Sequence, residues 1–217
     1  MKNYCSTAAA LLLALAAIPA QAHYLWLEPA DGKAQLCFGE YENALREKSG
    51  GRLDSIARPE VQTNDGARAA VAVQRQADHF ALAAASGQPL VAQETGMAVK
   101  DLRQHHLGIV KPMYYARFAA AEAEGASTLA LDIRPLGQGR VRVSLHGQPL
   151  AKAKLSVFAP NQWLREYETD ANGETVIETP WPGLYVLEVA HVEPVQGIYQ
   201  DAAFDGVRHV GTLSFVR

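Results

Sequence analysis

The chain has 217 residues, with 20 lysines and arginines against 23 aspartates and glutamates, a formal net charge of −3. This near-even charge balance excludes the strongly basic proteins that bind nucleic acid or an anionic membrane surface through charge alone. Hydrophobic residues make up 48% of the chain, enough to fill the core of one large domain or two small ones of ~100–150 residues each. We therefore expect a folded protein with no nucleic-acid partner.

Residues 1–22 have the pattern of a secretory signal peptide. Lys2 is followed by an apolar run from Ala8 to Ile18, and the segment ends on the small residues of Ala20-Gln21-Ala22. Cleavage after Ala22 would remove 22 of the 217 residues and leave 195. No second apolar run approaches the ~20 residues that span a bilayer. The sequence thus predicts a periplasmic protein whose mature chain has no membrane span.

The chain has two cysteines, and one of them lies in this segment. Cys5 precedes the apolar run of the signal, so Cys37 would be the sole cysteine of the exported protein. One cysteine cannot form an internal disulfide. Because it lies in the apolar sequence Leu36-Cys37-Phe38, we expect Cys37 to be a small buried hydrophobe rather than a reactive thiol.

Residues 23–118 are expected to form an irregular β domain. Apolar and aromatic runs at 24–27, 33–38 and 107–118 read as strands. The stretch 40–58 is dense in charge and predicts a long, partly helical loop.

Residues 119–127 are small and polar and predict a linker, after which 128–217 are expected to form an Ig-like antiparallel β-sandwich. Here seven short alternating segments are separated by Gly, Pro and Asn turns, and Thr169–Glu174 reads as a hairpin. The fold class predicted is all-β, with less than a fifth of the chain helical. The seven segments are 129–135, 140–145, 152–158, 163–168, 174–178, 184–193 and 207–216.

Histidines are the candidate metal ligands. A mature chain beginning with His23 would offer an α-amine and Nδ1 on one residue, which can together chelate a transition metal. His191 and His209 would meet if their strands pair, and they are the first choice to complete the site. His79 and His106 are held in reserve. Each also has an ordinary interpretation, such as a histidine oriented by its neighbour, as Asp78 would orient His79.

Three sequence motifs resemble the transthyretin-like, carboxypeptidase-regulatory type of Ig-like module. They are His146-Gly147-Gln148-Pro149-Leu150 with the alanines that follow, then Thr169-Asp170-Ala171-Asn172-Gly173, then Pro182-Gly183-Leu184-Tyr185. The resemblance implies a fold and says little about function.

With the start His23-Tyr24-Leu25-Trp26-Leu27-Glu28-Pro29, the expected mature chain also resembles the exported NikM-like, nickel-uptake-associated proteins. That resemblance implies a periplasmic protein near nickel, cobalt or other metal transport, with a metal-transporter component as a partner. The chain departs from the integral-membrane component of similar name, because it lacks spanning helices. Its histidine also stands at mature position 1 rather than 3, so a tripeptide-type amino-terminal copper or nickel site is absent.

Three functions remain open from the sequence. The first is a non-enzymatic binding protein for a divalent transition metal (Ni, Co or Cu) that accompanies metal uptake or handling. The second is a non-metal interaction module, in which Trp26, Trp163 and Trp181 are core or contact residues. The third is a copper redox enzyme with an amino-terminal histidine brace. The usual nucleophile, zinc-protease and phosphate-loop motifs are missing from the sequence, so we rank the binding protein first.

Overall fold

The computed structural model describes residues 23–119, 125 and 127–217. The expected signal peptide and most of the expected linker lie outside these residues. Of the described residues, 54% lie in strands and 5% in helices, which confirms the all-β prediction and the low helix content. None of the described helices is long and apolar enough to cross a membrane.

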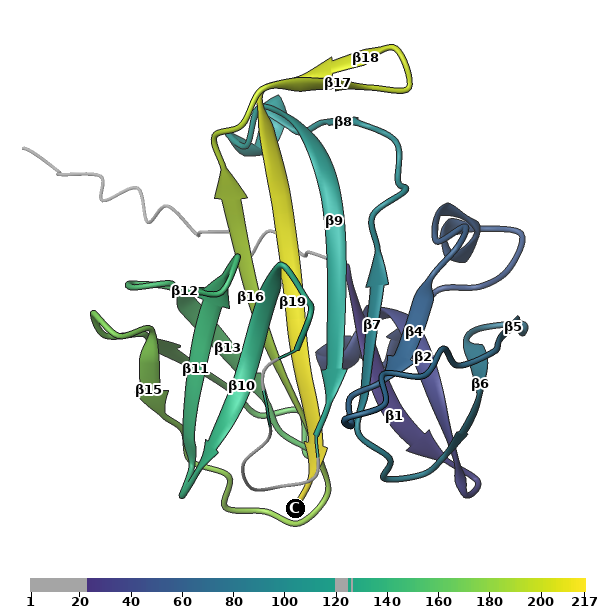
Figure 1. Cartoon of the computed structure of the whole chain (residues 1–217), viewed down its shortest axis with the longest axis vertical. Coiled ribbons are helices and arrows are strands. Elements are labelled where there is room, and N and C mark those ends of the chain that lie inside the picture. The colour runs from purple at the N-terminus through teal and green to yellow at the C-terminus, as the bar shows by residue number, and fades with distance from the viewer. Residues whose placement is uncertain (1–22, 120–124, 126) are drawn as a thin grey trace, which may run out of the picture.

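An eight-stranded sheet forms the centre of the molecule, in the order β14-β13-β16-β19-β9-β7-β4, with β8 also paired to β9. Its long strands β9, β16 and β19 run along the molecule (Figure 1). The strands are β4 Glu60–Thr63, β7 Leu90–Glu94, β8 Lys100–Asp101, β9 Ile109–Phe118, β13 Lys154–Phe158, β14 Leu164–Glu168, β16 Leu184–Glu193 and β19 Gly206–Val216.

The last strand, β19, joins the two halves of the chain. It pairs antiparallel with β16 and parallel with β9, from Gly206 opposite Val110 to Ser214 opposite Phe118. Nine of its eleven residues are buried. Strands buried on both faces belong inside a sheet, with a hydrogen-bonded neighbour at each edge. The expected modules 23–118 and 128–217 therefore do not mark sheet boundaries, because one sheet draws strands from both.

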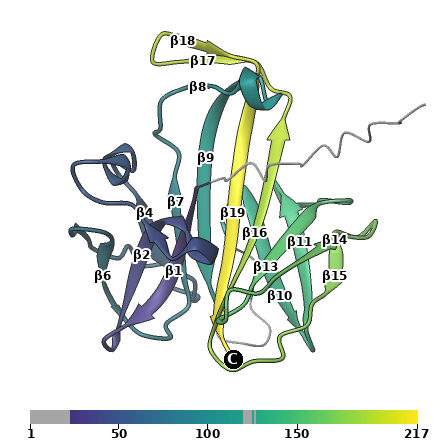
Figure 2. The ribbon, with the colours of Figure 1, turned by 180° about the vertical axis from the view of Figure 1, so that it is seen from behind.

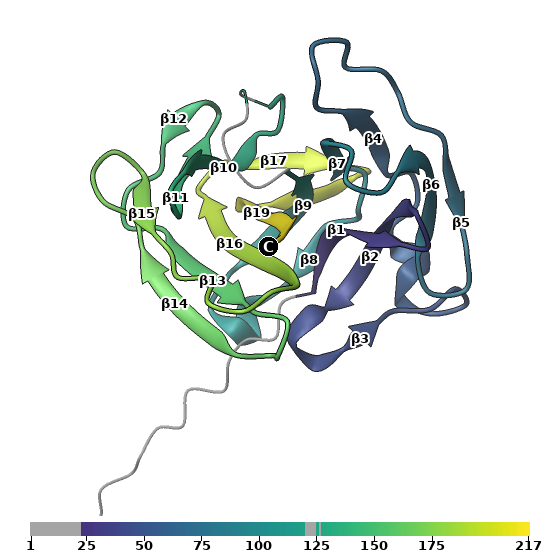
Figure 3. The same cartoon turned by 90° about the horizontal axis from the view of Figure 1, so that it is seen from below.

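Two smaller sheets cover opposite faces of the central sheet, as the view from below in Figure 3 shows. Successive residues of β9 point to opposite faces. Accordingly Tyr114 packs in one core and Tyr115 in the other. The covering strands are β1 Tyr24–Ala30, β2 Lys33–Glu40, β3 Leu45–Arg46, β5 Val73–Arg75 and β6 Phe80–Ala85 on the first face, and β10 Leu131–Gly137, β11 Arg140–Leu145, β12 Gln148–Pro149 and β15 Glu174–Val176 on the second.

Short elements complete the fold. The charged stretch 40–58 holds the 3₁₀ helices η1 (Tyr41–Asn43) and η2 (Arg52–Ser55), as the expectation of a partly helical loop anticipated. A third, η3 (Arg103–His105), lies near β8. The hairpin of β17 (Gly197–Tyr199) and β18 (Ala202–Phe204) was not expected. It projects at the end where β19 begins, seen from behind in Figure 2.

The turn at Thr169–Glu174 is real but is not a hairpin. Asp170 Oδ1 accepts hydrogen bonds from the backbone N–H groups of Asn172 and Glu174, which fixes the turn. The flanking strands then separate, because β14 pairs with β13 in the central sheet whereas β15 pairs with β11 in the covering sheet. The prediction of a hairpin was wrong, and the turn instead carries the chain between layers.

A buried ion pair links two of the layers and provides a test of the packing. Arg117 of β9 is fully buried and donates to both carboxylate oxygens of Asp132 in β10, at 3.1 and 2.9 Å. Asp132→Ala would remove two charge-assisted hydrogen bonds from the buried guanidinium, so we expect the free energy of unfolding to fall by about 2–4 kcal/mol. Urea denaturation measures the change. The matched control is Asp101→Ala, which removes the exposed pair with Arg103 and should change the free energy of unfolding far less, because solvent screens the pair.

The environment of Cys37 leads to a second prediction. Its side chain is fully buried, and burial, followed by the Glu28 charge, raises the pKa of its thiol well above the usual value. Because the thiolate is the reactive form, native protein should react with a thiol reagent at neutral pH far more slowly than protein unfolded in urea. Equal labelling rates in the two states would contradict the structure.

Candidate functional site

Two histidines and one glutamate converge at one end of the central sheet. Glu193 Oε2 lies 3.1 Å from His146 Nε2 and 3.2 Å from His209 Nε2. One ligand atom from each residue lies within 4.8 Å of the other two. His209 is nearly fully buried, Glu193 is half-buried and His146 is exposed. Two imidazoles and a carboxylate around a common point form a set of donors suited to a divalent transition metal.

Strand pairing places two of these residues. In β16 and β19, His191 stands directly opposite His209. Directly opposed residues project to the same face of a sheet, and Glu193 shares that face because it lies two residues beyond His191. His191 is half-buried and close enough for its charge to lower the pKa of His209, but it is not one of the three converging residues.

A tight turn presents the third residue. His146 and Gly147 form the two-residue connection between β11 and β12, with φ of 50° and 77°. Two successive positive φ values are characteristic of a type I′ turn, which suits paired antiparallel strands. The turn thus holds the His146 side chain beside the end of β16, where its ring contacts that of His209 edge-on at 5.6 Å.

A buried hydroxyl orients the His209 ring. Tyr115 Oη lies 3.1 Å from His209 Nδ1 and 3.3 Å from Met113 Sδ, and the two rings are stacked. Burial raises the pKa of Tyr115, so the phenol keeps its proton. That proton can be donated to Nδ1 while Nε2–H donates to Glu193. Alternatively it can be donated to the sulfur while Nδ1–H donates to the phenol oxygen. The second arrangement frees the Nε2 lone pair for a ligand.

The electrostatics of the group favour its metal-binding protonation states. Burial lowers the pKa of His209, against the opposing effect of Glu193. The hydrogen bond from His146, with a smaller effect from His209, lowers the pKa of Glu193. At neutral pH His209 is therefore a neutral imidazole and Glu193 a carboxylate, the forms that coordinate metals.

The other sequence candidates lie elsewhere. His23 is on the opposite side of the central sheet, because it lines a cleft with Arg208, and Arg208 and His209 are successive residues of one strand. Its Nε2 lies 2.5 Å from Glu47 Oε1 and its Nδ1 3.3 Å from Glu40 Oε1. The expected site of His23, His191 and His209 is therefore not assembled, since the central sheet separates His23 from His209 and His191 is not one of the converging ligands.

His79 and His106, the reserve candidates, also stand apart. His79 Nδ1 lies 2.8 Å from Asp78 Oδ1, the oriented-histidine interpretation left open from the sequence. His106 is exposed at the end of η3 with a φ of 59°. His146 was missed as a ligand because it appeared only within a turn motif. Its one sequence signal is the His-Gly pair directly after an alternating strand, a position that projects a side chain at a sheet end.

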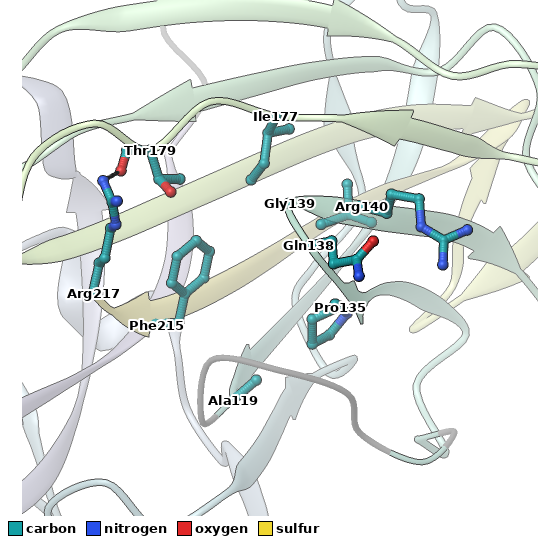
Figure 4. Close-up of a pocket in the computed structure, with 11 residues that line it drawn as sticks. Ala119, Pro135, Gln138, Gly139, Arg140, Ile177, Thr179, Phe215 and Arg217 are labelled. Atoms are coloured by element: carbon teal, nitrogen blue, oxygen red, sulfur yellow. Dashed lines mark hydrogen bonds between the residues drawn. The ribbon is translucent and has the colours of Figure 1, made fainter.

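Figure 4 shows a separate, mainly apolar pocket of about 240 Å³. Ile177, Phe215 and Pro135 form its apolar walls, with Arg140 and Arg217 at the rim. Arg217 donates to the Thr179 carbonyl. Neither a histidine nor a carboxylate lines this pocket among the described residues, so it offers no metal ligand.

A further cleft of about 480 Å³, near the start of β1, is lined by the half-buried Glu188. Burial raises the pKa of Glu188 to about 7, with the charge of Arg208 opposing the shift. Its Oε1 is buried without a hydrogen-bond partner. The neutral carboxyl therefore predominates below about pH 7 in the folded protein, whereas the unfolded chain ionises near 4.5.

This shift predicts a pH-dependent effect of Glu188→Gln. A folded pKa above the unfolded value gives stability that is present below pH 4.5 and lost as pH rises through about 7. Wild type should therefore lose about 1–3 kcal/mol of unfolding free energy relative to Glu188→Gln between pH 5 and pH 8. Urea denaturation at both pH values gives the comparison. A difference between the two proteins that stays constant with pH would contradict the assignment.

Comparisons of the chain with protein-family models, with curated proteins and with solved structures found no match in any of the three. The resemblances noted in the sequence stay expectations, and the candidate site rests on its own geometry.

Proposed function

We propose that this protein is a periplasmic binding protein for a divalent transition metal, with His146, Glu193 and His209 as its ligands. The supporting observation is the convergence of His146 Nε2 and His209 Nε2 on the same oxygen of Glu193. In the metal-free protein these atoms hold one another by hydrogen bonds. A bound metal would replace these hydrogen bonds to Glu193. His209 would then carry its proton on Nδ1 and donate it to the Tyr115 oxygen.

The degree of exposure suits a site that exchanges its metal. His209 is fixed in the core, whereas the His146 side chain is 53% exposed and that of Glu193 28%. Structural metal sites are closed, whereas three protein ligands at a surface leave a coordination position open to water or to a second molecule. A nickel, cobalt or copper ion could therefore be passed to another protein, such as a transporter component. We propose binding and handling of the metal, without catalysis.

Metal titration of ligand variants tests this proposal. We expect His209→Ala and His146→Ala each to weaken binding of Ni²⁺, Co²⁺ or Cu²⁺ by a factor on the order of 100, because each removes one of three ligands. Isothermal titration calorimetry of metal-stripped protein gives the affinities. Affinity should also fall as pH drops towards and below ~6.5, since protonated imidazoles cannot coordinate.

The controls separate this site from the histidines favoured by the sequence. His79→Ala, a histidine paired with Asp78 away from the site, should leave the affinity unchanged. One alanine placed before His23 in the exported protein keeps the imidazole but removes any amine chelate. If that variant loses metal binding while His209→Ala retains it, the metal site is at the amino terminus and the proposed ligand set is refuted.

A further inference from the structure

The cleft beside His23 concentrates positive charge. It has a volume of about 460 Å³, and the cations Arg52, Lys100 and Arg208 line it together with His23 and His105. These groups come from separate parts of the chain: Arg52 from η2, Lys100 from β8 and Arg208 from β19. No aspartate or glutamate lines it among the residues that the structure describes. The fold thus gathers like charges at one place.

The three cations lack carboxylate partners. Within the described parts of the chain, none of them lies within 4.0 Å of a carboxylate oxygen. Arg208 is only 8% exposed and makes its hydrogen bond to the neutral phenol of Tyr114. Of the acids outside the lining, Glu47 pairs with His23, and Glu188 interacts electrostatically with Arg208 without an ion pair within 4.0 Å. Buried cations are normally in contact with a carboxylate, so a buried arginine with none within 4.0 Å among the described residues is suited to an anion from outside.

The cations also act on one another. Partial burial lowers the pKa of Lys100, and the charges of Arg52 and Arg208 lower it further. This mutual repulsion is an unfavourable electrostatic energy in the empty cleft. An anion bound between the three groups would relieve it, and the two guanidinium groups can each donate two parallel hydrogen bonds to a carboxylate or phosphate.

The remaining lining is mainly apolar, which favours a ligand that has a carbon skeleton as well as negative charge. Phe38, Leu102 and Leu107 form the walls beside the phenol of Tyr114. The volume lies within the usual range of ~300–1,000 Å³ for small-molecule sites, which combine apolar walls with a few placed polar groups. A free inorganic ion would leave these walls in contact with water alone.

We propose that this cleft binds a small organic anion carrying at least two negative charges, a polycarboxylate or a phosphate monoester, held by Arg52, Lys100 and Arg208. The site is distinct from the His146, Glu193 and His209 group, which lies on the other face of the central sheet. It does not depend on whether that group binds a metal.

Binding measurements on the metal-stripped full chain test the inference. The probes are citrate, glycerol 2-phosphate and inorganic phosphate, compared by calorimetry at constant ionic strength. We expect saturable binding of at least one organic probe and a loss of roughly tenfold or more in Arg52→Gln and in Lys100→Gln, as removal of a charge-assisted hydrogen bond predicts. Both residues lie near the surface, so these variants should fold even if Arg208→Gln does not.

A matched control guards against general charge effects. Arg103→Gln removes an exposed arginine that pairs with Asp101. Arg103 lies three residues after Lys100 in the chain, but it does not line the cleft. It should bind the organic anion as wild type does. The inference fails if no organic probe saturates at concentrations up to about 10 mM, or if Arg103→Gln weakens binding as much as Arg52→Gln. Binding of inorganic phosphate alone would overturn the assignment to an organic anion.

Discussion

The pairing of β19 on both of its edges is the constraint on which the rest of the structure depends. The strand bonds to β16 on one side and β9 on the other, and covering sheets bury both of its faces. A backbone in that position has every N–H and C=O oriented towards a neighbour, so it cannot rotate or slip by one residue without reversing its faces. This is why Arg208 and His209, adjacent in sequence, are committed to different sites.

Local patterns in the sequence predict individual strands well but not their partners. The bounds expected for 140–145 and 184–193 match β11 and β16, because alternation and turn residues act over a few positions. The antiparallel pairing that places His191 opposite His209 could be predicted, because the two strands are close together in the sequence. The parallel pairing of β19 with β9 did not, since it joins residues about a hundred positions apart and depends on how the two cores pack.

The candidate sites show the same limit in their residues. His209 could be chosen from its place in a strand, whereas His146 could be recognised only once the turn after β11 was known to face the end of β16. The cationic cleft had no sequence signal. Arg52 belongs to a charged stretch that resembles a solvated loop, and only the packing of η2 and β8 beside β19 brings Arg52 and Lys100 to Arg208. The cleft is recognised because its three cations have no carboxylate partner among the described residues.

The rigidity of β19 also bears on how the two sites relate. Energetic coupling between sites requires an element with two discrete arrangements, each favoured by a different ligand. Although Arg208 and His209 are adjacent, the strand that carries them is paired at both edges and buried on both faces. A ligand on one face can therefore be accommodated by side chains and loops alone, by His146 at its exposed turn or by Arg52 and Lys100 at the cleft surface. The geometry favours two independent sites sharing one scaffold.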